Sequence, residues 1–266
     1  MRWEELTGDQ FPEAVEQSGG VCLLPTSCIE RHAHHLPLVT DMYIARELCR
    51  RTAALEPAVV FPDFVFTQIL EARCYPGTIA IDPDLILKLL ENVCREIARN
   101  GLKKIVIVNA HGGNSALLPY LSQSQLVSPR DYVIYTAEPS LAPEETSTLQ
   151  TKWGISGLDH AGAVETSMIM VARPDLVHAD QIRDDGEGQP QGRLKSIMDH
   201  GVRTAIWWYS DHPSHYAGDA VPSSAEAGDY LLNAQARALA AAVRAIKADT
   251  ESKRLQDEFF SKSQHG

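Results

Sequence analysis

The stretch CIERHAHHLPLVTD, residues 28–41, holds three histidines and two acids in fourteen positions. It follows the apolar run 21–24, so ionisable side chains come directly after a strand that we expect to be buried. Glu30, His32 and Asp41 offer carboxylate oxygens and imidazole nitrogens, which suit zinc, manganese or iron. A carboxylate such as Asp41 can also bridge two cations that hold a hydroxide between them and polarise a carbonyl. This stretch therefore predicts metal-assisted hydrolysis.

Two further stretches carry the same kinds of side chain. His111 lies in NAHGGN, directly after an apolar run, and the two glycines would let the backbone turn sharply into a helix. His160 and Glu165 lie in DHAGAVETS, residues 159–167, where they precede or open another helix. Each cluster has a structural alternative, since Glu165 could serve only the helix dipole and Asp41 could be only an N-cap. The coincidence of three clusters at strand ends or helix starts favours a site.

The composition narrows the classes of partner. The chain has 266 residues, with 24 Lys plus Arg against 35 Asp plus Glu and a formal net charge of −11. An acidic surface repels phosphate backbones and anionic lipid, so nucleic acid is not an expected partner. No apolar run approaches the ~20 residues that span a bilayer, and no secretory leader is recognisable. We expect a cytoplasmic protein that makes no membrane contact.

The cysteines argue against a disulfide framework or a zinc knuckle. They are odd in number, scattered, and form no C-x-x-C pair. We interpret them as buried thiols in a reducing compartment, none of them placed as a thiolate to compete for the metal. The five are Cys22, Cys28, Cys49, Cys74 and Cys94.

The elements that must position these side chains alternate between strand and helix. Continuous apolar runs predict strands covered on both faces. They span 21–24, 59–66 (interrupted by Pro62), 105–108 and 132–135. Caps and apolar spacing predict the helices. The predicted helices run from Asp82 to Gly101, from Asp41 to about Ala53, and across 164–171 to before Pro174. A further helix is predicted to start near Gly113 or Asn114, and a long one runs from Ser223 or Ser224 to about Lys247.

This alternation predicts an α/β fold of three layers, α/β/α, with a mostly parallel central sheet. We find no linker, repeat or low-complexity tract, so one domain over residues 1–266 is the simpler interpretation. The polar segment 184–192, DDGEGQPQG, is expected to be an exposed loop. In such sheets ligands bind beyond the carboxyl ends of the strands, where the three clusters are expected to meet.

Several motifs in this order resemble the creatininase (creatinine amidohydrolase) family. They are ERHAHHLPL with Asp41, YPGTI from Tyr75, NAHGGN, HAGAVETS and the tail GDAVPSSAEAG. The resemblance covers residues 1 to about 245. It implies a three-layer α/β/α domain around a mostly parallel sheet, a small-molecule substrate, and assembly as a homohexamer.

The resemblance also implies two divalent metal ions, zinc, manganese or iron. The implied ligands are Glu30, Asp41 and His111 for one metal, and His32, Asp41 and Glu165 for the other, with Asp41 as the bridge. It assigns His160 the general acid/base role in protonating the leaving group. His35 is expected to orient a ligand from behind.

Departures from the family pattern bear on the substrate. Creatininase itself has Tyr and Glu where this chain has Gly112 and Gly113, and it draws a metal ligand from that Glu. The second site must then take its carboxylate from Glu165, and creatinine is not the expected substrate. Ala33 also stands where the family prefers Gly.

Three residues are candidates for substrate contacts. Arg73 could clamp a carboxylate or another oxygen-rich group, although a structural role is as good an interpretation. Asp159 could orient His160 or contact substrate, and Trp153 could line a pocket. The pair Trp207-Trp208 is interpreted as filling the core or subunit contacts.

The predicted activity is that of a metal-dependent amidohydrolase in which metal-bound hydroxide opens a small cyclic or linear amide. The family leaves two alternatives open, a formamide deformylase and the cleavage of a C–C bond in a cyclic keto-sugar or keto-inositol. An alternative of another class is a non-catalytic binding or assembly protein. That class predicts the loss of one or more ligands, whereas all five are present.

Overall fold

A parallel sheet forms the middle of the computed structural model, which describes residues 1–157 and 159–263. Its strand order is β2-β1-β3-β4, and every pairing is parallel. The strands are β1 Val21–Thr26, β2 Val59–Val60, β3 Lys104–Asn109 and β4 Val133–Ala137. All of β1 and most of β3 are buried, as expected for strands covered on both faces.

The strand expected over 59–66 is shorter than predicted. Regular pairing ends at Val60, and the chain returns to the sheet only through an isolated bridge between Thr26 and Phe64. Pro62 lies in the gap, has no N–H for the ladder and has a restricted φ angle. The run predicted over 59–66, interrupted by Pro62, therefore forms a regular strand only at Val59–Val60 and returns to the sheet only at Phe64.

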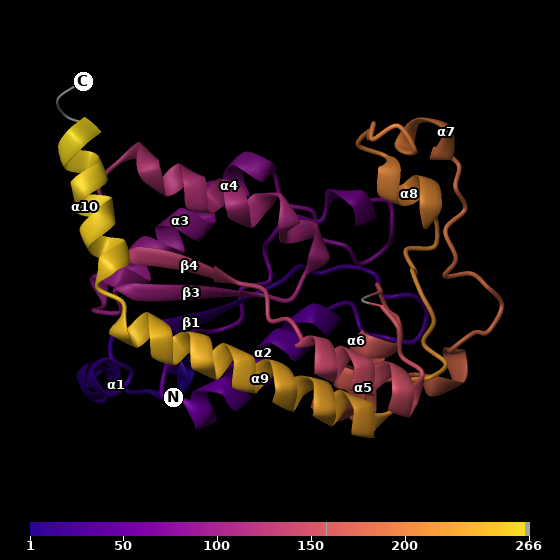
Figure 1. The fold of residues 1–266 in the computed structure, drawn as a ribbon, viewed down its shortest axis with the longest axis horizontal. Helices are drawn as coiled ribbons and strands as arrows, with labels where there is room; N and C mark the ends of the chain where they lie inside the picture. Colours follow the sequence, from indigo (N-terminus) through magenta and orange to yellow (C-terminus); the bar gives the residue numbers. More distant parts are fainter. Residues whose placement is uncertain (158, 264–266) are drawn as a thin grey trace.

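Helices cover both faces of the sheet, which confirms the three layers (Figure 1). The α-helices are α1 Phe11–Gln17, α2 Thr40–Leu55, α3 Pro83–Arg99, α4 Leu117–Ser124, α5 Pro143–Trp153, α6 Ala163–Ala172, α7 Lys195–Met198, α8 Trp207–Asp211, α9 Ala225–Ala248 and α10 Glu251–Ser263. The 3-10 turns are η1 Trp3–Glu5, η2 Leu70–Ala72, η3 Gly112–Ser115, η4 Gln125–Val127, η5 Pro174–Leu176 and η6 Ala179–Gln181.

The two faces of the sheet have separate apolar cores because side chains alternate along a strand. Leu23 of β1 packs with α2, α6 and α9 on one face. Its neighbour Leu24 packs with α3 and α4 on the other. The part of the chain that the structure describes contains no helix long and apolar enough to cross a membrane.

Two helices start where their capping residues predict. The Asp82 side chain accepts a hydrogen bond from the backbone N–H of Asp84 at the start of α3. Ser224 does the same for Ala227 at the start of α9. The helix expected near Gly113 begins later, because a 3-10 turn over Gly112–Ser115 comes before α4.

The segment between α6 and α9 is largely irregular and carries the short helices α7 and α8. Figure 1 shows these two helices beyond the carboxyl ends of the strands, at the end of the molecule opposite α10. This segment therefore lies on the side of the sheet where the predicted site residues meet.

Candidate metal centre

The ends of β1 and β3 bring the first donor residues together. Thr26, the last residue of β1, pairs with Asn109, the last residue of β3. The chain beyond β1 is held by backbone bonds, including one from the N–H of Glu30 to the carbonyl of Leu38 (2.9 Å). Glu30 and His111 follow these neighbouring strand ends, so their side chains meet at one edge of the sheet.

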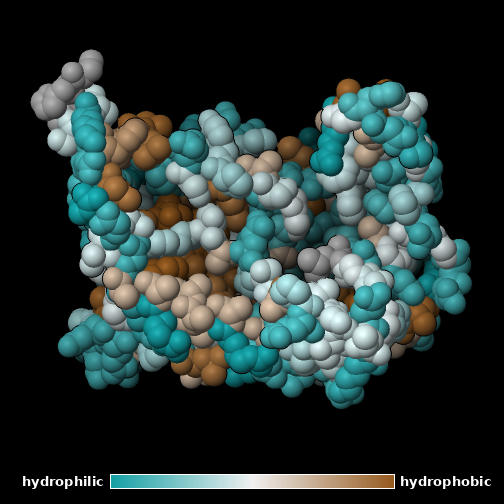
Figure 2. Space-filling view, viewed as in Figure 1, coloured by the Kyte–Doolittle hydropathy of each residue, from teal (hydrophilic) through white to brown (hydrophobic). Residues whose placement is uncertain are grey.

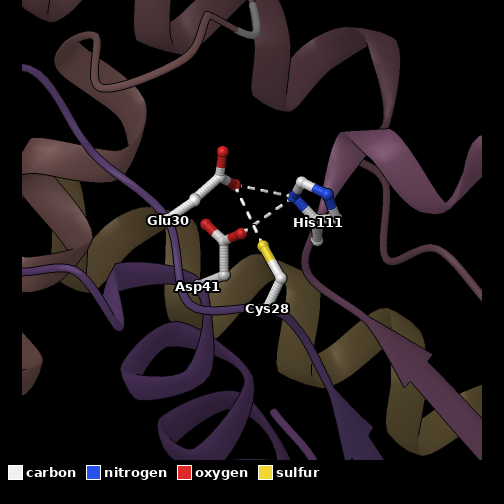
Figure 3. A group of neighbouring side chains, drawn as sticks. All are labelled: Cys28, Glu30, Asp41 and His111. Carbon is white, nitrogen blue, oxygen red and sulfur yellow. Dashed lines mark hydrogen bonds and ion pairs between the residues drawn. The ribbon is translucent and has the colours of Figure 1, made fainter. Parts of the chain in front are cut away.

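A first donor group contains Glu30, Asp41 and His111 (Figure 3). Nδ1 of His111 lies 2.8 Å from Oε1 of Glu30 and 3.1 Å from Oδ2 of Asp41. All three residues are buried. The sulfur of Cys28 lies in the same group, 3.2 Å from Oε1 of Glu30.

A second donor group shares Asp41 with the first. Nε2 of His32 lies 3.0 Å from Oδ1 of Asp41 and 3.8 Å from Oε2 of Glu165. Glu165 lies in the first turn of α6, where its carboxylate also accepts the backbone N–H of Ala161 (2.7 Å). The five predicted ligands thus converge, with one oxygen of Asp41 facing each group.

The pKa values of the three carboxyl groups in the centre are shifted in different directions. Burial alone would raise the pKa of Glu30, but the positive charge of His111 lowers that pKa well below its usual value. Burial also opposes ionisation of Asp41, whose pKa His32 lowers. At Glu165 burial prevails over the attraction of His32 and raises the pKa to about 8.

In the absence of metal, protonated His32 and His111 balance the negative charge of these carboxylates. Burial would lower the pKa of His32, but Asp41 raises it to about 10. His111 is likewise held protonated, since Glu30 raises its pKa well above the usual value against the effect of burial. A divalent cation bound here would balance these carboxylates in place of the two protons, which His32 and His111 would release to solvent so that each imidazole could bind the ion.

His160 lies against the centre as a neutral imidazole. Burial lowers its pKa to about 3 despite the opposing attraction of Glu30. Its Nε2–H donates to the backbone carbonyl of Arg31 (2.9 Å), which leaves the lone pair on Nδ1. Its ring centroid lies 4.4 Å from that of His32.

His35 lies behind the centre instead of in it. Its Nε2 lies 2.9 Å from the hydroxyl of Thr166, the residue after Glu165 on α6. Burial lowers the pKa of His35 to about 4. His35 therefore contacts the helix that carries Glu165, and its expected role in orienting a ligand stays a prediction.

A hydrogen-bonded chain that the sequence analysis missed holds the outer oxygen of Glu30. The indole N–H of Trp208 donates to Nδ1 of His215 (2.8 Å). His215 then donates from Nε2 to Oε2 of Glu30 (2.5 Å). Trp208 also lies edge-on to His160, with centroids 6.0 Å apart. Trp208 therefore contacts the centre, which the sequence analysis did not foresee, and its interpretation as a subunit contact stays a prediction.

The comparison with known proteins places the chain in a family. A model of the creatininase family, described as creatinine amidohydrolase, matches residues 4–243. The chain belongs to the creatininase family. It is accordingly a hydrolase of a family whose members are metal-dependent amidohydrolases.

Its relatives have different substrates. Creatinine amidohydrolase of Pseudomonas putida is 25% identical over 68% of this chain and 75% of its own. A mycofactocin precursor peptide peptidase of Mycolicibacterium smegmatis is 30% identical over 69% and 70%. A 2-amino-5-formylamino-6-ribosylaminopyrimidin-4(3H)-one 5'-monophosphate deformylase of Methanococcus maripaludis is 32% identical over 44% and 51%.

Solved creatininases share the fold. A mutant creatininase described as Zn-Zn type superposes with a TM-score of 0.74 at 22% identity, covering 91% of this chain and 96% of that one. A creatininase described as Mn gives a TM-score of 0.73 at 21% identity, covering 91% and 97%. These neighbours therefore carry zinc or manganese.

At position 113 neighbouring side chains leave no room for a residue larger than glycine. A Cβ there would collide with Nε2 of His111 and lie 2.6 Å from Oε1 of Glu71. The space is thus occupied by two other side chains. Besides Asp41, Glu165 is the carboxylate that the described part of the chain brings to His32.

Several residues near the centre have a strained, left-handed backbone conformation. Among the described residues, the non-glycine residues with positive φ are Ala33 (51°), Ala161 (57°) and His215 (57°). Ala33 follows His32, and the left-handed backbone there explains why the creatininase family prefers Gly. Strain of this kind persists where the surrounding structure over-determines a site.

The three candidates for substrate contacts lie in different places. Asp159 is half-buried beside the centre and packs against Gly218. Arg73 is exposed at the end of the η2 turn. The ring of Trp153 packs on Tyr230 of α9, with centroids 5.3 Å apart. Within the described ranges, no hydrogen bond or ion pair joins Asp159, Arg73 or Trp153 to the five predicted ligands, so their roles in binding substrate stay predictions.

Two expectations about the surroundings need correction. The loop 184–192 is not wholly exposed, because Glu187 forms an ion pair with His34 (3.0 Å) and Gly188 is buried against Gly218. The cysteines are not all buried either, since Cys74 is exposed. Cys28 is buried within the donor group, so the expectation that no thiol competes for the metal is wrong.

Proposed function

We propose that this chain is a dinuclear metal-dependent hydrolase that opens the C–N bond of a small cyclic or linear amide other than creatinine. The position of Asp41 carries the proposal. Its two oxygens lie 3.0 Å from His32 and 3.1 Å from His111, so one carboxylate serves two donor groups. A buried carboxylate between two such groups is the arrangement that a bridged pair of cations requires.

The donor types fit the implied metals. The predicted ligands of each group combine carboxylate oxygens with one imidazole nitrogen, which suits zinc, manganese or iron; Cys28 lies beside the first group and His160 beside the second. The residues that would hold the first ion are Glu30, Asp41 and His111, and those that would hold the second are His32, Asp41 and Glu165. Two divalent cations bound there polarise a carbonyl and lower the pKa of water.

The chain's own residues then position groups and move the proton. His160 keeps its Nε2–H on the carbonyl of Arg31, so Nδ1 is the atom that can accept a proton and return it to the leaving nitrogen. Trp208 and His215 hold one oxygen of Glu30, which leaves the other directed at the donor group. His160 therefore has the proton-transfer role, and His215 positions Glu30.

The substrate differs from creatinine because Gly112 and Gly113 replace a Tyr and a ligand Glu of creatininase. The relatives named as a peptidase and a deformylase support amides of other shapes. The deformylase relative makes a formamide the second candidate substrate. In each case the bond broken is the C–N bond of an acyl group.

A screen for acid release tests the proposal. The purified chain, supplied with zinc or manganese, is offered lactams, formamides, short peptides and cyclic ketones. We expect hydrolysis of an amide, with about two metal ions per chain, and a fall in kcat of about 100-fold or more in His160→Gln with both metals retained. Fewer than one metal per chain and no turnover would favour a non-catalytic binding protein. Hydrolysis of a cyclic ketone alone would favour C–C cleavage.

A homohexamer stays a proposal that rests on the family resemblance. Figure 2 shows hydrophobic surface in the hollow between α10 and the sheet. Leu255 and Phe259 of α10 line a cavity of about 350 Å³ there together with residues of β4. Exposed apolar surface of this kind suits contact between copies of a chain. Light scattering on the purified protein measures the state directly.

A further inference from the structure

We propose that the thiolate of Cys28 is a fourth protein donor at the metal position of Glu30, Asp41 and His111, and that it makes this position prefer zinc to manganese. The inference rests on the proposed function, because it needs a metal at that position. It concerns the identity of the metal, which the proposed function leaves open.

Geometry places the sulfur among the donors. Sγ of Cys28 lies 3.2 Å from Oε1 of Glu30 (Figure 3). Donor atoms of Cys28, Glu30, Asp41 and His111 all lie within 4.8 Å of one another. Bonds of about 2.0–2.3 Å in a tetrahedral zinc site separate neighbouring donors by roughly 3.3–3.8 Å. The group is therefore of the size that one ion can share.

The alternative is that Cys28 only fills the core. It belongs to a small apolar cluster with Ile69 and Ala72, and a free cysteine often behaves as a small hydrophobe. Cys22 behaves in that way, since it lies in the core between the sheet and α3 and its sulfur contacts the backbone carbonyl of Leu23. Cys28 differs because its sulfur contacts the carboxylate of a predicted ligand.

The donor chemistry predicts the preference. Thiolate is a soft ligand that favours zinc, whereas manganese favours carboxylate, carbonyl and water. A metal ion that binds Cys28 replaces the thiol proton, which passes to solvent, and the S–M bond takes the place of the S–H bond. The second position has only oxygen and nitrogen donors from its predicted ligands, so the two positions should select metals differently.

Cobalt substitution tests the sulfur contact directly. The full chain is stripped of metal, loaded with Co²⁺ and followed by near-ultraviolet absorption, where thiolate ligation gives a sulfur-to-cobalt charge-transfer band. We expect this band in the unmodified chain and in the matched control Cys22→Ser, and its loss in Cys28→Ser and in Cys28→Ala. Because the first measurement needs no substitution at Cys28, it decides the proposal even if the variants fold poorly.

Competition between zinc and manganese tests the preference. We expect the ratio of bound zinc to bound manganese to fall about tenfold or more in Cys28→Ser and to stay unchanged in Cys22→Ser. Two bound cobalt ions without the band, or an unchanged ratio, would overturn the role of Cys28 and leave the proposed hydrolase intact. A chain that binds no cobalt would overturn both.

Discussion

The two metal positions that we propose for the centre are built differently. The first draws on residues just beyond β1 and β3, and the side chains of Glu30 and His111 are 1% and 6% exposed. The second draws on Glu165 of α6, whose side chain is 18% exposed, and it lies beside His160. The first position, the enclosed one, is thus more deeply buried than the second, the open one, whose Glu165 keeps some exposure to solvent.

This difference suggests a division of labour. Structural metal sites are closed by protein ligands, whereas catalytic sites keep a position free for water or substrate. The enclosed position, with Cys28 beside its donors, should bind its ion tightly. The open position has a wider spacing, 3.8 Å between Oε2 of Glu165 and Nε2 of His32. It should therefore bind its ion more weakly and contact substrate. The variants below sharpen or break this comparison.

Asp41→Asn should have the largest effect, because Asp41 is the carboxylate that both positions share. We expect loss of both metals and a fall in kcat/KM well beyond the 10–100-fold that loss of an outer partner costs. Metal content and turnover measure this. Asp84→Asn is the matched control, since Asp84 also lies in a helix's first turn but is exposed. Two metals in Asp41→Asn would refute the bridge.

Glu165→Gln should empty the open position alone. We expect one metal per chain instead of two, most activity lost, and an unchanged circular dichroism spectrum, because the enclosed position keeps its own donors. Glu226→Gln is the control, since Glu226 is an exposed acid in the first turn of α9. If Glu165→Gln retains both metals, the assignment of the second position is incorrect.

Trp208→Phe should weaken the enclosed position by a smaller factor. It removes the N–H that orients His215 toward Glu30, and loss of such an outer partner costs about 10–100-fold in metal affinity or activity. Competition with a chelator measures the affinity of each position. Trp207→Phe serves as the control because the described contacts of His215 involve Trp208 and not Trp207. Equal weakening by both variants would argue against the hydrogen-bonded chain.

Ala33→Gly should have the smallest effect. Relief of the left-handed backbone should raise the free energy of unfolding by about 1–2 kcal/mol. The larger unfolded-state entropy of glycine should lower it by roughly 0.5–1 kcal/mol. We expect a net gain of a few tenths to about 1 kcal/mol in the free energy of unfolding, measured by urea denaturation. Ala53→Gly in α2 should lose about 1 kcal/mol instead. A loss in Ala33→Gly would show that its buried methyl group outweighs the strain.

Much of the fold follows from local signals. Asp82 and Ser224 cap their helices because a short polar side chain before an apolar period satisfies the first free N–H groups. The strand at 59–66 is shorter than predicted because regular pairing does not resume after the interruption at Pro62, which a hydrophobic run does not show. The helix near Gly113 began late because the two glycines and Asn114 favour a turn first.

The sequence by itself determined the alternation of strands and helices, the types of the candidate metal donors and their convergence. It could do so because parallel strands carry their following residues to one edge of the sheet. The tertiary structure alone decided that Cys28 faces Glu30 and that Trp208 reaches that carboxylate through His215. For Trp208 and His215 the physical reason is that the segment between α6 and α9 has little periodic structure, so its path depends on packing between residues far apart in the chain; for Cys28 it is that the chain beyond β1 is irregular, so the direction of its side chain does not follow from the strand pattern.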